Sequence, residues 1–84
     1  MPEKVFVGKV DHFYDRVSVA AIILEEELAV GDKITIEKDE NVVEQEVTSM
    51  QIDRADVRKA AKGDSVGIKT MQPVEKGSSV YKWV

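Results

Sequence analysis

The sequence predicts an all-β domain, a small closed β-barrel of about six short strands. Short segments of alternating or β-branched apolar residues recur along the whole chain, and turn residues separate them. The 84 residues include no cysteine, so packing without disulfides must stabilise the fold. A closed barrel leaves little open sheet edge to protect, and the length suits a single domain over residues 1–84.

Two strands are expected before residue 25. Residues 4–10 are β-branched and predict a strand, whereas residues 11–16 are polar with two aromatic residues and predict a loop. Residues 16–24 first alternate and then become continuously apolar, as in a strand that is buried on both sides at its end. A short helix through Ala20 to Glu27 is the other interpretation of this segment.

The remaining elements follow from alternation and turn residues. Residues 33–37 alternate and predict a strand, and residues 39–41 predict a hairpin turn in which Asn41 adopts the left-handed conformation. In residues 42–52 the apolar positions change phase, which requires a bulge or a bend. Alanines and charges predict one short helix or helical turn near residues 54–62. Residues 65–70 and 78–83 predict two further strands, with Pro73 in the loop between them.

A turn motif is repeated within the chain. Residues 29–37 and 61–69 share an alanine, a glycine-aspartate pair and the apolar positions that follow, and a weaker copy begins at residue 76. The glycine supplies the positive φ of a tight turn, Asp or Ser caps it, and a strand begins. We therefore expect structural turns at Gly31, Asp32, Gly63, Asp64 and Gly77.

The formal net charge of −4 is unevenly distributed. Residues 25–46 hold nine acidic and two basic side chains, whereas residues 54–84 hold seven basic and three acidic ones. Either these charges simply form a solvated surface, or the domain is bipolar and its basic part docks an acidic partner or an RNA backbone.

Five segments carry a family resemblance. The first is a Gly-x-Val strand at residues 7–10, and the second is a leucine followed by glycine-aspartate at residues 28–34. The third is a Val-x-Ser-hydrophobic-Gln strand at residues 47–51. The fourth, at residues 60–68, is an alanine followed by glycine-aspartate and x-valine-glycine, and a closing turn at residues 74–77 is the fifth. Together they resemble the second, β-barrel domain of translational GTPases of the elongation factor Tu type. The C-terminal barrel of collagenase-like peptidases is similar to about the same degree. The resemblance implies a six-stranded Greek-key barrel and, through the GTPases, a role close to tRNA. No P-loop is present, so nucleotide chemistry is not expected.

Residues suited to catalysis are few. His12 is the only histidine, and with Asp11 and Asp15 it could be interpreted as a metal or acid–base site. A metal site needs three or four converging ligands, which one loop with a histidine and two acids does not readily supply. Adjacent carboxylates in residues 25–27 would point to opposite faces of an extended chain. We therefore expect no enzyme activity, no metal and no other cofactor. The longest apolar run is too short to span a membrane, and residues 1–4 carry no secretion signal, so a cytoplasmic location is expected.

The sequence thus favours a non-catalytic binding module for RNA or a protein of the translation apparatus. The alternative is a protein-interaction or self-associating module without an RNA role, which would use the acidic residues 25–46 or an unpaired sheet edge; a monomer or weak homo-oligomer is expected. Tyr81 and Trp83 share one face of the last strand, where they either plug the barrel end or form an exposed stacking surface. The expected binding residues are Arg54, Arg58, Lys59 and Lys62, with Phe13 and Tyr14 as aromatic candidates.

Overall fold

The computed structural model describes residues 3–84, and all their regular structure is β-strand. This confirms the all-β prediction. The strands are β1 (Lys4–Tyr14), β2 (Val19–Leu24), β3 (Leu28–Ala29), β4 (Lys33–Lys38), β5 (Asn41–Glu46), β6 (Met50–Ile52), β7 (Ala55–Val57), β8 (Lys59–Ala60), β9 (Ser65–Lys69) and β10 (Ser79–Trp83). The predicted count of six strands is too low, because β3, β6, β7 and β8 have only two or three residues each and carry almost no alternation of their own.

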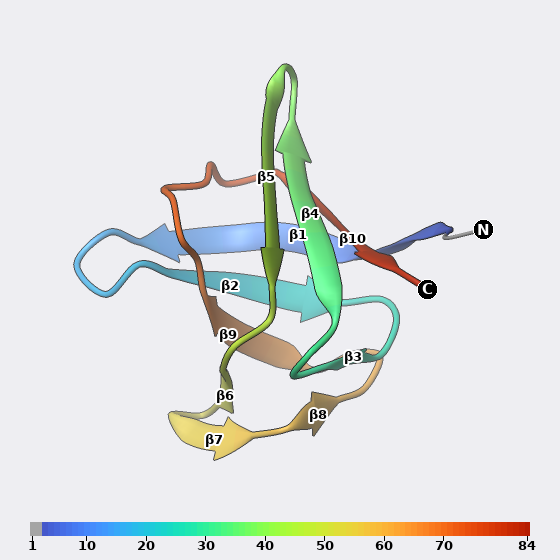
Figure 1. The fold of residues 1–84 in the computed structure, drawn as a ribbon. Coiled ribbons are helices and arrows are strands. Elements are labelled where there is room, and N and C mark those ends of the chain that lie inside the picture. The colour runs from blue at the N-terminus through green and yellow to red at the C-terminus, as the bar shows by residue number, and fades with distance from the viewer. Residues whose placement is uncertain (1–2) are drawn as a thin grey trace.

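Eight strands form one antiparallel sheet in the order β5-β4-β10-β1-β2-β9-β6-β7, and β3 pairs with β8 in a separate ribbon (Figure 1). The strand pairing leaves this sheet with two ends, at β5 and β7, so a closed barrel is not established by it. Glu3, the first described residue, lies beside Val84, and the two exchange backbone hydrogen bonds of 2.9 and 2.8 Å.

A buried glutamine connects distant parts of the curled sheet. Gln45 on β5 donates from Nε2 to the carbonyl of Lys69 at 2.8 Å, and its Oε1 accepts the backbone N–H of Met71 at 2.8 Å. Only 8% of Gln45 is exposed. The amide therefore ties the β5 end of the sheet to the end of β9, in place of a backbone ladder.

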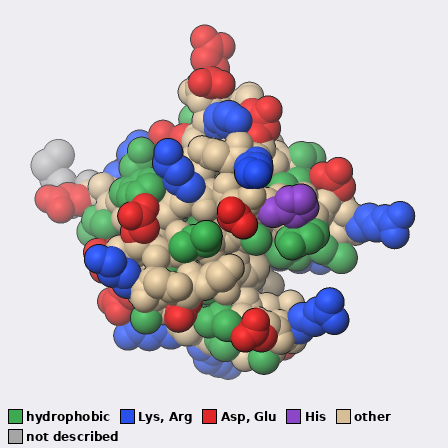
Figure 2. Space-filling model, turned by 180° about the vertical axis from the view of Figure 1, so that it is seen from behind, with side chains coloured by type: hydrophobic (Ala, Val, Ile, Leu, Met, Phe, Trp, Pro, Cys, Tyr) green, Lys and Arg blue, Asp and Glu red, His purple; other side chains and the backbone are tan. Residues whose placement is uncertain are grey.

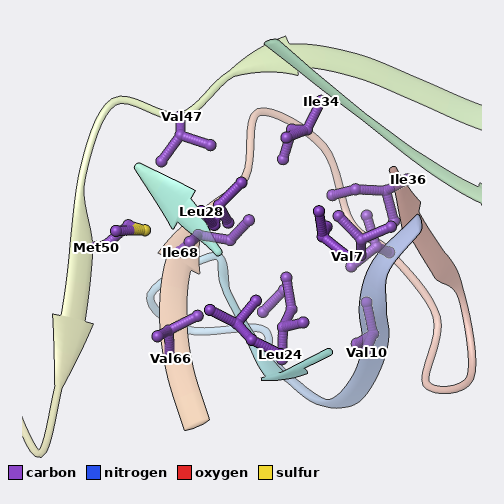
Figure 3. Packing of buried hydrophobic residues seen from close by; sticks show 14 of the residues in the cluster. Val7, Val10, Leu24, Leu28, Ile34, Ile36, Val47, Met50, Val66 and Ile68 are labelled. Carbon is purple, nitrogen blue, oxygen red and sulfur yellow. The ribbon is translucent and has the colours of Figure 1, made fainter. Parts of the chain in front are cut away.

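The core is entirely aliphatic apart from one methionine (Figure 3). Alternate residues of β2 point inward, which confirms the strand interpretation of this segment over the helical one. The expectation that its end is buried on both sides is wrong, because Ile23 is about half exposed. No aromatic side chain belongs to the buried set; Phe13 only packs against its margin. The core residues are Val7, Val10, Ala20, Ile22, Leu24, Leu28, Ile34, Ile36, Val43, Val47, Met50, Ala60, Val66, Ile68, Val74 and Val80.

The helix predicted near residues 54–62 is wrong. Asp53 and Arg54 have φ angles of 50° and 67°, which match the two-residue type I′ hairpin turn that joins β6 to β7 and cannot start a right-handed helix. The next residues then pair in β8 with β3. The spacing of alanines and charges did not reveal this, because small residues at irregular intervals carry no strong period.

Two local predictions in the first half also need correction. The predicted loop at residues 11–16 is largely strand, since β1 continues to Tyr14 through a register shift between Val10 and His12. In the β4–β5 hairpin the positive φ falls on Asp39, at 54°, and not on Asn41, which already pairs with Lys38. The phase change in residues 42–52 corresponds to the irregular segment between the end of β5 at Glu46 and the start of β6 at Met50.

Three tight turns organise the chain between strands. Gly31, Gly63 and Gly77 have φ angles of 99°, 92° and 89° and occupy the third position of turns closed by backbone bonds of 3.0–3.1 Å. Asp32 and Asp64 each accept a further bond of 2.9 Å from the first residue of their turn. In the third turn the hydroxyl of Ser78 donates instead to the carbonyl of Glu75, at 2.6 Å.

Candidate functional site

The four basic residues favoured by the sequence lie along one exposed segment without forming a compact site. Arg54 is at the tip of the β6–β7 hairpin, Arg58 lies between β7 and β8, and Lys62 is the second residue of the tight turn that contains Gly63. Lys59 on β8 pairs with Glu27 at 3.6 Å, and both side chains are more than half exposed. An exposed pair of this kind contributes little energy and partly neutralises the segment.

The two aromatic candidates belong to a different part of the molecule. Phe13 and Tyr14 lie at the end of β1, in the β1–β2 hairpin, which Figure 1 shows apart from β7 and β8. They are neighbours on a strand, so Phe13 packs toward the core while Tyr14 is about half exposed. The ring of Tyr14 lies 4.4 Å from that of His12, edge to face, and the purple histidine in Figure 2 lies beside hydrophobic side chains.

A notch separates the β1–β2 hairpin from β6. Its volume is about 320 Å³, and β9 forms its floor. The residues that line it are Val17, Val19, Ser49, Gln51, Gly67 and Lys69. None of the six predicted binding residues lines this notch, so the structure does not bring the basic and aromatic candidates together there.

Three aromatic side chains that the predicted set omits share the outer face of the sheet. Cross-strand pairing places Phe6 of β1 opposite Tyr81 of β10, and their rings meet edge to face with centroids 5.6 Å apart. Trp83 follows on the same face of β10 and is 39% exposed. We call Phe6, Tyr81 and Trp83 the aromatic face. The alternation of Tyr81 and Trp83 in the sequence was the signal for it, and the structure selects the exposed surface over the barrel plug.

Charged side chains fix one side of the aromatic face. The ammonium group of Lys4 lies 4.7 Å from the centre of the Tyr81 ring and 2.9 Å from Oε2 of Glu37. The same oxygen accepts the hydroxyl of Thr35 at 2.8 Å. The hydrogen bond from Lys4 and that from Thr35 lower the pKa of Glu37, and the bond to Glu37 raises the pKa of Lys4. Lys4 and Glu37 therefore neutralise each other's charge.

A groove of about 270 Å³ opens on the other side of Trp83. It crosses the ends of β10, β4 and β5, and its lining is mainly apolar, with carboxylates at one margin. The lining residues are Lys33, Ile34, Glu44, Gln45, Glu46 and Trp83. A flat indole beside carboxylates is an arrangement suited to binding.

A metal site, an acid–base site at His12 and a membrane span would each require a specific geometry in the described residues. Within residues 3–84 no group of three or more His, Asp or Glu side chains converges as metal ligands would. His12, the expected candidate for acid–base chemistry, is exposed in a hairpin and touches an aromatic ring. The same stretch of chain contains no helix with the length and apolar character needed to cross a bilayer.

The fold has close counterparts among solved structures. Two structures of the C-terminal domain of a "putative U32 peptidase" from Geobacillus thermoleovorans superpose with TM-scores of 0.84 and 0.86. They cover 89% and 93% of this chain and 95% and 91% of theirs, at 15% and 16% sequence identity. The chain has the fold of a peptidase C-terminal domain.

A curated protein of Methanocaldococcus jannaschii named as an "uncharacterized protease" is 46% identical over 79 residues. The match covers 93% of this chain and only 19% of that protein. No family model matches the chain. These similarities agree with the resemblance to the C-terminal barrel of collagenase-like peptidases, and they do not support the resemblance to elongation factor Tu.

Proposed function

We propose that this chain is a non-catalytic accessory domain that binds a polypeptide partner, and that the partner is a peptidase-type protein. The main support is the match to about one fifth of a protein named as a protease, together with the fold of a peptidase C-terminal domain. In such proteins the remaining four fifths would carry any peptide-cleaving site. The domain's own contribution would be to hold or orient a polypeptide.

The aromatic face and its groove are the surface proposed for this contact. Large aromatic side chains supply contact area at low cost in conformational entropy and are enriched where proteins bind one another. Three of the five aromatic residues of the chain lie on this face, and none is in the buried core. Glu37, Glu44 and Glu46 on the same outer face oppose a phosphate backbone, which favours a polypeptide over RNA.

For the fold, we propose that the curled sheet behaves as one closed barrel. The two hydrogen bonds of Gln45 support this, because they connect β5 to the segment that follows β9. A single closed unit would hold the aromatic face rigid, and a rigid surface loses less entropy when a partner binds.

The accessory role is tested by affinity capture from an extract of the source cells, with the immobilised chain and with two variants. We expect a peptidase-type protein to be retained, with or without ribonuclease, and the Trp83→Ala variant to lose it. The matched control, Arg58→Glu with Lys59→Glu, changes the predicted basic segment and should retain it. Loss of the partner on ribonuclease treatment, or only in the charge-reversed variant, would instead assign the domain an RNA role.

A further inference from the structure

The groove beside Trp83 has the composition of a site for a cationic side chain. Its lining combines the indole of Trp83 with the carboxylates of Glu44 and Glu46, while the side chain of Ile34 beneath it belongs to the buried core. The register places these groups on one face: Glu46 lies opposite Lys33 on β4, and Glu44 opposite Thr35. Tyr81 pairs with that same threonine from the other side, so Trp83 comes next to Lys33.

Glu44 and Glu46 have the spacing of an extended ligand. They are two residues apart on β5 and both are exposed, so their Cα atoms lie about 6.6 Å apart along the strand. An extended peptide presents alternate side chains at the same interval. Two bases at alternate positions of such a segment would therefore face the two carboxylates.

The charges around the groove leave room for a cation. The ion pairs found in residues 3–84 are Lys4 with Glu37 and Lys59 with Glu27, and neither involves Glu44 or Glu46. Among residues 3–84, Lys33 is the single base that lines the groove, so two carboxylates and one ammonium give this lining a net charge of −1. Lys4, on the far side of Trp83, is already engaged by Glu37.

We propose that this groove binds arginine side chains of an extended polypeptide segment. A guanidinium group stacks on an indole and donates two parallel hydrogen bonds to a carboxylate, which a compact ammonium group cannot match. The indole of Trp83 would also cover the methylene stem. Acidic peptides and phosphate backbones would meet the carboxylates with like charge. This inference rests on the proposed function, since it names the chemistry by which the accessory domain would recognise a polypeptide.

Trp83 is the only tryptophan, so its fluorescence reports on the groove alone. The probe is the blocked pentapeptide acetyl-Ala-Arg-Ala-Arg-Ala-amide, titrated to about 5 mM at low salt, where exposed charge pairs are least screened. Its isosteric citrulline analogue, its glutamate analogue and a single-stranded RNA pentamer are the comparison ligands. We expect a saturable change in Trp83 emission with the arginine peptide and none with the other three.

Two double variants separate a local site from the overall charge. Glu44→Gln with Glu46→Gln should weaken binding about 2- to 5-fold for each carboxylate, the range expected of exposed ion pairs. Glu25→Gln with Glu26→Gln removes the same charge from an exposed loop elsewhere and should leave binding unchanged. Lys33→Gln removes the competing ammonium group and should strengthen binding.

Three results would overturn the site: no emission change with the arginine peptide, equal weakening by both double variants, or a larger response to the RNA or to the glutamate peptide. The titration uses a defined peptide and does not depend on which protein the domain retains from an extract. A negative titration with successful capture would therefore reject the arginine site and leave the accessory role standing, while the reverse pattern would reject the accessory role.

Discussion

Replacing Gly8 by alanine should destabilise the fold more than any other single methyl addition at a glycine. Gly8 lies in β1 next to a register shift, with φ at 155°. A Cβ atom there would overlap the carbonyl oxygen of Ile23 and lie 3.1 Å from Cγ2 of Ile22. Both neighbours belong to β2, which is paired on both of its edges, so neither can move freely.

Gly31 provides the matched control. Its φ of 99° also disfavours alanine, but no heavy atom lies within 4 Å of the added Cβ. Gly31→Ala should therefore cost about 1–2 kcal/mol, the penalty for a left-handed residue with a side chain. Gly8→Ala adds an overpacking cost of about 1–3 kcal/mol, which gives a total of about 2–5 kcal/mol. A domain of this length is stable by only about 4–13 kcal/mol.

The assay is urea unfolding at equilibrium, followed by circular dichroism and by Trp83 fluorescence. For a small domain the free energy of unfolding falls by about 1 kcal/mol per molar urea. The midpoint should drop by about 1–2 M in Gly31→Ala and by about 2–5 M in Gly8→Ala. Equal midpoints in the two variants would refute the reasoning, because they would show that the approach of β2 to Gly8 costs nothing.

Two further predictions concern the polar contacts of the sheet. Gln45→Leu removes two buried hydrogen bonds and should lower the free energy of unfolding by about 1–3 kcal/mol. The control, Gln51→Leu at an exposed position, should change the free energy of unfolding by no more than about 0.5 kcal/mol. Equal melting temperatures of the two variants would contradict the bridging role of Gln45. Because the pKa of Glu37 is lowered in the folded protein, its pairing with Lys4 stabilises the fold above the ordinary pKa of 4.5 and is lost as the pH falls through the folded value. Between about pH 5 and 3 the melting temperature of Glu37→Gln should therefore fall less than that of the parent protein. Parallel curves of melting temperature against pH would exclude the effect.

The class of fold could be predicted from the sequence because alternation is a local property. In β4 and β9 each apolar residue alternates with a residue of the opposite face over five or six positions, long enough for the period to be recognised. In β7 and β8 two or three residues carry no period, and a pair of positive φ angles at Asp53 and Arg54 decides the structure. Neither residue is a glycine, so nothing in the composition marked that turn.

Only part of the candidate site could be predicted from the sequence. The basic residues 54–62 stood out by charge, but charge along a chain does not show whether side chains converge. The structure spreads them over a hairpin tip, a bend and a turn. Glu44 and Glu46 belonged to the acidic residues 25–46, for which the sequence left open a solvated surface or a docking surface, and nothing in the sequence connected them to Trp83.

By itself, the sequence determined the all-β class, the shortage of catalytic side chains and the shared face of Tyr81 and Trp83, because each depends on composition or on contacts within a few residues. The tertiary structure decided that this face points outward, that the core is aliphatic and that Glu44 and Glu46 lie across β4 from Trp83. These features depend on the order and register of strands far apart in the chain. Register is set by the packing of the whole sheet, and a shift of one residue would exchange its inner and outer faces.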